Sequence, residues 1–391
     1  MLTRFKEDRI NSLLKQFPVT AIVGPRQCGK TTIAKQVLKR IDGIYFDLES
    51  PADRLKFDEP EFLLNSIEYK LVVIDEVQRI PELFAILRSV VDKNKRKGNY
   101  LLLGSASPNL IKGVSESLAG RIAYCDIAPF NITEVYKTER DINKHWFRGG
   151  FPDAYLARSE DQCRLWLNNF FKTFIERDLN NLFGVNFSTE LMFKIWRMLA
   201  HGNGYVWNAA AFAKGLDVSP TTVNRYLDFL EGAFMIRKLP PYFNNAKKRL
   251  VKSPKIYIRD SGILHYLQDI ISSKKLLNNS AVGNAWEGYV VEQILQLIPD
   301  SIQPYFYRTA DGSEMDLLLV KGIAPIACIE IKTSNSPTIS RGFHESLRDL
   351  KCKNAFIITP HQDDVYKRDK QTTVCGLIDF LRICLPELIK K

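Results

Sequence analysis

The chain has 391 residues, 45% of them hydrophobic and 25% charged, with a formal net charge of +11 at pH 7. This length exceeds what one small hydrophobic core supports, and this composition excludes a disordered chain, so we expect several folded domains. The basic charge favours polyanions such as nucleic acid, although many basic proteins bind no anion specifically.

The first nine residues are largely charged and lack the apolar stretch of a secretory signal. No later segment approaches the roughly 18 consecutive apolar residues that a membrane helix needs. The seven cysteines are scattered without a Cys-x-x-Cys pair, which argues against a disulfide framework and a zinc knuckle. We therefore expect a cytoplasmic protein without a membrane partner.

Short apolar runs alternate with helical patterns from about residue 18 to residue 130. Strands separated in this way predict βαβ units and a mainly parallel sheet, so the expected fold class is α/β. The predicted strands are residues 20–23, 43–47, 71–75, 100–104 and 123–127.

A phosphate-binding loop follows the first of these strands. Residues 24–31 match the pattern G-x4-G-K-[ST] in full and lead into a helical run. Backbone amides of such a loop surround phosphate, its lysine contacts the β- and γ-phosphates, and its hydroxyl residue ligates Mg²⁺. The predicted nucleotide-binding residues are Gly24, Pro25, Arg26, Gln27, Cys28, Gly29, Lys30, Thr31 and Thr32, with Thr31 also a ligand of Mg²⁺.

Two carboxylates end the strand at residues 71–75 and its following position. We expect Asp75 to hold Mg²⁺ through its water shell and Glu76 to orient or deprotonate the attacking water. The alternative is a surface acidic pair on an edge turn. No guanine-reading Asn/Thr-Lys-x-Asp motif occurs, so ATP is preferred over GTP, and Glu76 favours hydrolysis over kinase chemistry.

Two further residues are candidates for sensing or stabilising the γ-phosphate. Ser105 follows the strand at 100–104, which in AAA+ ATPases lies between the first and second motif strands; it could instead only cap the next helix. Arg121 could act as an arginine finger in cis, or in trans within a homo-oligomer. The alternative for Arg121 is a surface or ion-paired arginine.

The middle of the chain changes character at the Gly-Gly and Pro residues of positions 149–152, where we predict a hinge. Residues 160–200 follow a helical period. A winged helix is then predicted from the N-cap Ser219 before Pro220, with residues 234–239 as a strand of the wing.

The outward positions of the winged helix's second helix are only weakly basic, so base reading is not expected. The segment 244–259 carries basic residues without any acid and has aromatic residues interleaved. It could track the phosphate backbone of DNA or RNA, or be a solvated face of a winged helix that docks a protein. The nucleic-acid candidates are Lys247, Lys248, Arg249, Lys252 and Lys255.

A second possible active site lies near the C-terminus, where the predicted order is helix, three strands, helix and strand. Asp316 lies on a strand, Glu330 and Lys332 project together because they are two apart on the next, and Glu287 lies on the preceding helix. This arrangement resembles the PD-(D/E)xK nuclease superfamily. The resemblance implies that Glu287, Asp316 and Glu330 bind a second Mg²⁺ or Mn²⁺ while Lys332 positions the nucleophile. The alternative is a buried ion-pair cluster on an inactive nuclease fold.

Nearly the whole chain resembles a widespread bacterial and archaeal family of AAA+ superfamily ATPases with a C-terminal domain of unknown function. The resemblance implies an ATPase domain at 1–145, a helical lid or linker at 146–200, a winged helix at 201–275 and a restriction-endonuclease-like domain at 276–391. It rests on residues 24–31, Asp75, Glu76, Gly104, Ser105, 117–121, 149–152, 176–178, 221–223, 225–227, 260–262, Trp286, Glu287, Asp316, Glu330 and Lys332.

Two functions remain open at this point. In the first, ATP binding and hydrolysis drive an enzyme that binds or processes DNA or RNA. In the second, the nucleotide state controls how the winged helix and an inert tail engage a partner protein.

Overall fold

The computed structural model describes most of the chain and gives it two units. Unit 1 comprises residues 1–130, 172–187 and 228–235, and unit 2 comprises residues 131–171, 188–227 and 236–391. No helix in the described part of the chain is long and apolar enough to cross a membrane. The described residues are 2–67, 70–94, 96–107, 118–185, 187–243, 250–334, 337–360 and 365–390.

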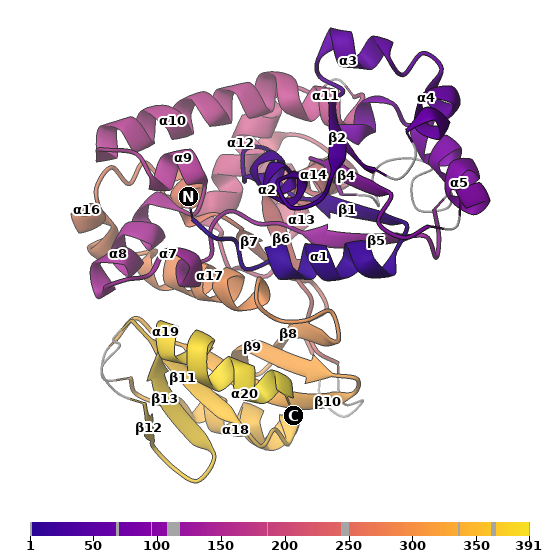
Figure 1. Ribbon diagram of the computed structural model, residues 1–391. Helices are drawn as coiled ribbons and strands as arrows, with labels where there is room; N and C mark the ends of the chain where they lie inside the picture. The colour runs from indigo at the N-terminus through magenta and orange to yellow at the C-terminus, as the bar shows by residue number, and fades with distance from the viewer. Residues whose placement is uncertain are drawn as a thin grey trace. The chain divides into compact units, whose positions relative to one another are not determined.

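A five-stranded sheet forms the centre of unit 1, with the strand order β2-β3-β4-β1-β5 and every pairing parallel (Figure 1). The strands agree with the predicted ones to within one residue, and β4 lies between β1 and β3 as the AAA+ pattern requires. Their bounds are β1 Val19–Val23, β2 Gly43–Asp47, β3 Leu71–Asp75, β4 Tyr100–Gly104 and β5 Ile122–Asp126.

Helices cover both faces of this sheet because its central strands are apolar on both sides. On β3, Leu71 and Val73 pack with helices α1 and α2, whereas Val72 and Ile74 pack with α5. This burial on both faces is the usual environment of parallel strands. The helical segments of unit 1 include α1 Glu7–Gln16, α2 Lys30–Leu38, α3 Pro51–Leu55, α4 Pro60–Ser66, a 3₁₀ turn Val77–Arg79, α5 Leu83–Asn94, a π-helical turn Phe174–Asp178 and α11 Leu179–Phe183.

The first part of unit 2 is mainly helical. Helices α10 Glu160–Thr173 and α14 Pro220–Gly232 begin in unit 2 and contribute their last residues to unit 1. Strands β6 Ile236–Leu239 and β7 Lys255–Ile258 form an antiparallel hairpin. The helix and strand predicted after Ser219 are thus present, while the winged-helix assignment stays a prediction. Other helices here are α7 Ile132–Val135, α8 Glu139–Arg148, α9 Pro152–Tyr155, α12 Thr189–His201, α13 Ala209–Leu216, α15 Ser261–Leu267 and α16 Ser273–Leu277.

A mixed six-stranded sheet with the order β12-β13-β11-β10-β9-β8 forms the C-terminal part of unit 2 (Figure 1). Strands β8, β9 and β10 pair antiparallel, whereas β11 pairs parallel with β10 and β13. The predicted order of helix, three strands, helix and strand is present. The elements are α17 Val282–Leu295, β8 Ile302–Arg308, β9 Glu314–Lys321, β10 Ala324–Ile331, α18 Arg341–Leu350, β11 Ala355–Thr359, β12 Tyr366–Lys367, β13 Thr372–Gly376, α19 Leu377–Asp379, a π-helical turn Phe380–Cys384 and α20 Leu385–Lys390.

The α/β fold class is therefore confirmed: a parallel sheet, then a helical region, then a domain with a mixed sheet. The four-part division of the chain stays a prediction.

Candidate active site

The phosphate-binding loop connects β1 to α2 at the carboxyl edge of the parallel sheet. Two of its positions need glycine for different reasons. Gly29 has φ 100° immediately before α2, a left-handed conformation that side chains disfavour. A Cβ at Gly24 would lie 2.0 Å from the carbonyl oxygen of Ile127, so close backbone packing excludes a side chain there.

Lys30 is the first residue of α2, and its ammonium is buried inside the loop. Its Nζ donates to the carbonyl oxygens of Gly24, at 3.0 Å, and Pro25, at 2.8 Å. Arg4 braces the loop: its Nη1 donates to Cys28 O at 2.8 Å and its Nη2 to Ala128 O at 2.6 Å. Sequence reasoning missed Arg4, because a lone arginine far ahead of the motif carries no local signal.

Thr31 and Asp75 meet at this edge, as the sequence predicted. Thr31 Oγ1 donates to Asp75 Oδ2 at 2.7 Å, and Tyr45 Oη donates to the same carboxylate oxygen at 2.6 Å. Burial, together with the Asp75 carboxylate, raises the pKa of Tyr45 well above its usual range, so the phenol stays a donor. A hydroxyl and a carboxylate are the hard oxygen ligands that Mg²⁺ prefers, so this pair fits a magnesium-bound nucleotide.

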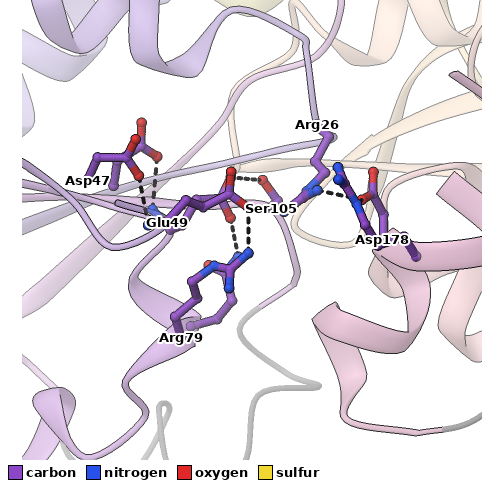
Figure 2. A network of polar contacts seen from close by, with 10 residues as sticks. Arg26, Asp47, Glu49, Arg79, Ser105 and Asp178 are labelled. Carbon is purple, nitrogen blue, oxygen red and sulfur yellow. Dashed lines mark hydrogen bonds and ion pairs between the residues drawn. The ribbon is translucent and has the colours of Figure 1, made fainter. Parts of the chain in front are cut away.

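Glu76 follows Asp75 with a left-handed backbone, φ 54°, which turns the chain away from the sheet. Its carboxylate accepts a hydrogen bond from Ser105 Oγ at 3.0 Å and another from Gln78 Nε2. Figure 2 shows Ser105 directed at this contact. Two strand ends, those of β3 and β4, thus hold Glu76 at the edge where the loop lies.

The remaining loop residues differ in exposure. Cys28 is buried with its Sγ 3.6 Å from Ile127 O, whereas Gln27 and Thr32 are exposed. Gln27 has φ 61°. The loop therefore presents backbone, rather than the Cys28 side chain, to the site.

Arg26 is the loop's second charged side chain, and it joins a network of ion pairs (Figure 2). Its Nη2 contacts Glu49 Oε1 at 2.7 Å and its Nη1 contacts Asp178 Oδ1 at 2.5 Å. Arg79 shares Glu49 at 2.6 Å, and Arg177 shares Asp178 at 3.3 Å. The sequence predicts Arg26 as a nucleotide-binding residue, but no local pattern predicts this network.

Arg121 is not brought to the nucleotide loop within its own chain. It immediately precedes β5, whose first residue pairs with Val19 at the start of β1, whereas the loop follows the end of β1. Its Nε and Nη2 contact the two carboxylate oxygens of Asp92, at 2.5 and 2.9 Å. The cis arginine finger is therefore wrong, because Arg121 lies at the amino edge of the sheet; the trans role stays a prediction.

The residues predicted for the second site do converge in unit 2. Lys332 Nζ lies 2.5 Å from Glu330 Oε1, and Asp316 Oδ2 accepts from the backbone N–H of Ile331 at 2.8 Å. Burial, and then the charges of Glu287 and Glu330, raise the pKa of Asp316 well above its usual range. The carboxylates of Glu287, Asp316 and Glu330 thus interact within one buried cluster, which we call the acid cluster.

A lysine lies within the acid cluster. Lys255 Nζ is 2.9 Å from Glu287 Oε1, 2.7 Å from Glu314 Oε1 and 3.9 Å from Asp316 Oδ1. Burial disfavours this ammonium, but Tyr257 and the carboxylates outweigh it and raise the pKa of Lys255. In the described part of the chain, no three His, Cys, Asp or Glu side chains are arranged to hold a metal ion. The second Mg²⁺ or Mn²⁺ at the acid cluster therefore stays a prediction.

The predicted nucleic-acid residues have different outcomes. Lys255 is a correction: it is 3% exposed inside the acid cluster and cannot contact a phosphate backbone. Lys252 is exposed. Lys247, Lys248 and Arg249 lie outside the described residues, as does Ser117 of the predicted 117–121 motif.

Comparison with known families divides the chain into matched segments. Residues 16–136 match a family described as an AAA domain. Residues 139–274 and 282–379 match two families, each described as a domain of unknown function (DUF8612 and DUF4143). With the sheet order and the loop geometry, the first match identifies an AAA-type P-loop ATPase fold.

Similar proteins extend over nearly the whole chain. Among solved structures, the Walker-type ATPase PABY2304 of Pyrococcus abyssi has a TM-score of 0.44 and 17% identity, covering 68% of this chain and 96% of that one. The uncharacterized proteins Rv2008c of Mycobacterium tuberculosis and Mb2031c of Mycobacterium bovis are each 40% identical over 353 residues, which are 90% of this chain and 78% of theirs. The chain belongs to the family of these two mycobacterial proteins.

Proposed function

We propose that this protein binds Mg-ATP at residues 24–32 and hydrolyses it. Lys30 binds the β- and γ-phosphates, and Thr31 and Asp75 hold Mg²⁺, which supplies charge neutralisation on the phosphates. Glu76 accepts a proton from, or orients, the attacking water, while Ser105 fixes the Glu76 carboxylate. The observation that carries this proposal is the hydrogen bond of 2.7 Å between Thr31 and Asp75, next to a Glu76 that Ser105 holds.

The test separates nucleotide binding from hydrolysis with two variants. Lys30→Ala should abolish ATP binding in calorimetry, because the ammonium that meets the phosphates is lost. Glu76→Gln should retain ATP binding and lower kcat by about 100-fold or more, because an amide cannot accept the water's proton.

Arg40→Ala is the matched control, since Arg40 is an exposed arginine that pairs with Glu7 at 2.6 Å elsewhere in unit 1. Its kcat and ATP affinity should stay at the wild-type values. Wild-type turnover in the Glu76 variant would refute the role of Glu76, and absence of heat with Mg-ATP in the wild-type protein would refute the proposal.

For the rest of the chain, we propose a nucleotide-controlled switch with a tail that does not cleave nucleic acid. The ammonium of Lys255 supports this choice over an ATP-driven nuclease, because it neutralises carboxylates that a catalytic metal would need. The exposed charge of Lys252 leaves binding of DNA or RNA as the competing outcome.

One panel of DNA and RNA substrates with Mg²⁺ or Mn²⁺ distinguishes the two functions. The wild-type protein should cleave none of them, and no polymer should raise its ATP turnover at low salt. Lys255→Met removes the ammonium while keeping an apolar chain of similar length, and it should gain Mn²⁺ affinity in nucleotide-free calorimetry. Asp316→Ala added to this variant should remove the gain. Wild-type cleavage that Asp316→Ala abolishes would establish the nuclease instead.

A further inference from the structure

Arg26 lies within the phosphate-binding loop, directly after Pro25. The ammonium of Lys30 bonds to the carbonyl oxygen of Pro25, the residue directly before Arg26, at 2.8 Å. Because this lysine contacts the β- and γ-phosphates in P-loop proteins, we expect the Pro25–Arg26 peptide to lie beside those phosphates.

Two carboxylates from distant segments hold the Arg26 guanidinium. Glu49 comes from the segment after β2, and Asp178 comes from the π-helical turn, 152 residues away in sequence. Asp178 is almost fully buried, with a side chain 4% exposed. π-Helical turns are rare and re-aim side chains, often at functional sites. Figure 2 shows the Arg26 and Asp178 side chains directed at one another.

The network leaves one N–H donor of Arg26 available to an anion. Its Nε is buried and has no hydrogen-bond partner among the described residues. Within this network the three guanidinium groups of Arg26, Arg79 and Arg177 share two carboxylates. Burial opposes the charge of Arg26, but the negative charges of Glu76, Asp178 and Glu49 outweigh it and raise its pKa.

We propose that Arg26 is the catalytic arginine of this ATP site: it contacts the γ-phosphate in cis, and Glu49 and Asp178 position it. This rests on the ATP hydrolysis proposed above. An arginine that neutralises the charge developing on the transferred phosphoryl group accelerates related enzymes by about 10³–10⁵-fold. Arg26 thus takes the role that Arg121, at the opposite edge of the sheet, cannot take within its own chain.

The test compares kcat with affinities for ADP and for a non-hydrolysable ATP analogue. Arg26→Ala should lower kcat by about 100-fold or more and weaken binding of the ATP analogue, while ADP affinity stays within about threefold of wild type, because ADP lacks the γ-phosphate. Asp178→Asn should lower kcat with little change in KM, since it loosens the guanidinium without removing it. Arg40→Ala, at the exposed arginine used as the control above, should leave kcat unchanged.

Each other outcome has a definite meaning. Arg26→Ala with wild-type kcat would overturn the proposal. Equal loss of ADP and analogue binding would also overturn it, because the lost contact would then not be specific to the γ-phosphate. Arg26→Lys, which keeps the positive charge and is the variant to use if Arg26→Ala does not fold, should retain ADP binding with reduced kcat. If the wild-type protein hydrolyses no ATP, the function proposed above fails, while the comparison of analogue with ADP still tests the γ-phosphate contact.

Discussion

His265 on α15 is a buried histidine whose surroundings favour its neutral form. Its Nδ1 lies 3.1 Å from the carbonyl oxygen of Phe147, and its Nε2 is buried without a hydrogen-bond partner among the described residues. Burial lowers the pKa of His265 to about 4. Protonation of Nε2 would place a charge without a hydrogen-bond partner inside the protein, so the native state disfavours it.

This histidine predicts an acid-dependent loss of stability. Below pH 6.5 the unfolded chain binds a proton at His265 that the native state refuses until about pH 4. The free energy of unfolding should therefore fall by about 3 kcal/mol, from this residue alone, as pH decreases through that window. His265→Asn keeps a donor for Phe147 O without titrating. Urea unfolding of both proteins at several pH values should show the difference between them changing with pH; a constant difference would contradict this account.

At the scale of elements, Gly149 at the end of α8 packs against Asp260 and Gly262 at the start of α15. Asp260 caps α15 by accepting from Ile263 N at 2.9 Å, and its other oxygen accepts from Gly150 N at 2.8 Å. Gly149 ends α8 with φ 78°. A Cβ on Gly149 would lie 2.2 Å from Asp260 Oδ1, so the capping carboxylate fits only against glycine. The residues predicted as a hinge thus pack tightly against Asp260, and the hinge stays a prediction.

Gly149→Ala should therefore lower the free energy of unfolding by more than its backbone conformation alone implies. Alanine at φ 78° and ψ −178° costs about 1–3 kcal/mol, and displacement of the Asp260 cap should bring the loss of unfolding free energy to at least about 3 kcal/mol. Gly312→Ala is the matched control, since Gly312 has φ 92° and no atom within 4 Å of its added Cβ. Urea unfolding followed by tryptophan fluorescence measures both variants. Equal losses would mean that the packing against Asp260 contributes nothing.

At the scale of the whole molecule, the net charge of +11 is a poor guide to partners, because individual lysines and arginines have different environments. Lys255 pairs within the acid cluster, Arg26 pairs with Asp178, and Arg121 pairs with Asp92. Charges that are paired within the fold in this way contribute less to a surface that binds polyanions.

The sequence by itself determined the elements whose signals are local. The P-loop pattern, the five strands of unit 1 and the acidic residues after β3 depend on spacing and hydrophobic period, which short-range sterics and burial control. The convergence of Thr31 with Asp75 also followed, because the carboxyl ends of parallel strands share one edge. The order of elements around Asp316 and Glu330 was predictable because it also depends on hydrophobic period.

Only the tertiary structure decided which partner each charged side chain receives. Asp178 contacts Arg26, which lies 152 residues away in the sequence. Lys255 lies in the acid cluster, although the basic stretch that contains it was predicted to be a surface. Arg121 is placed at the far edge of the sheet by the direction of β5. Such contacts depend on how distant segments pack together, and no local pattern in the chain specifies that packing.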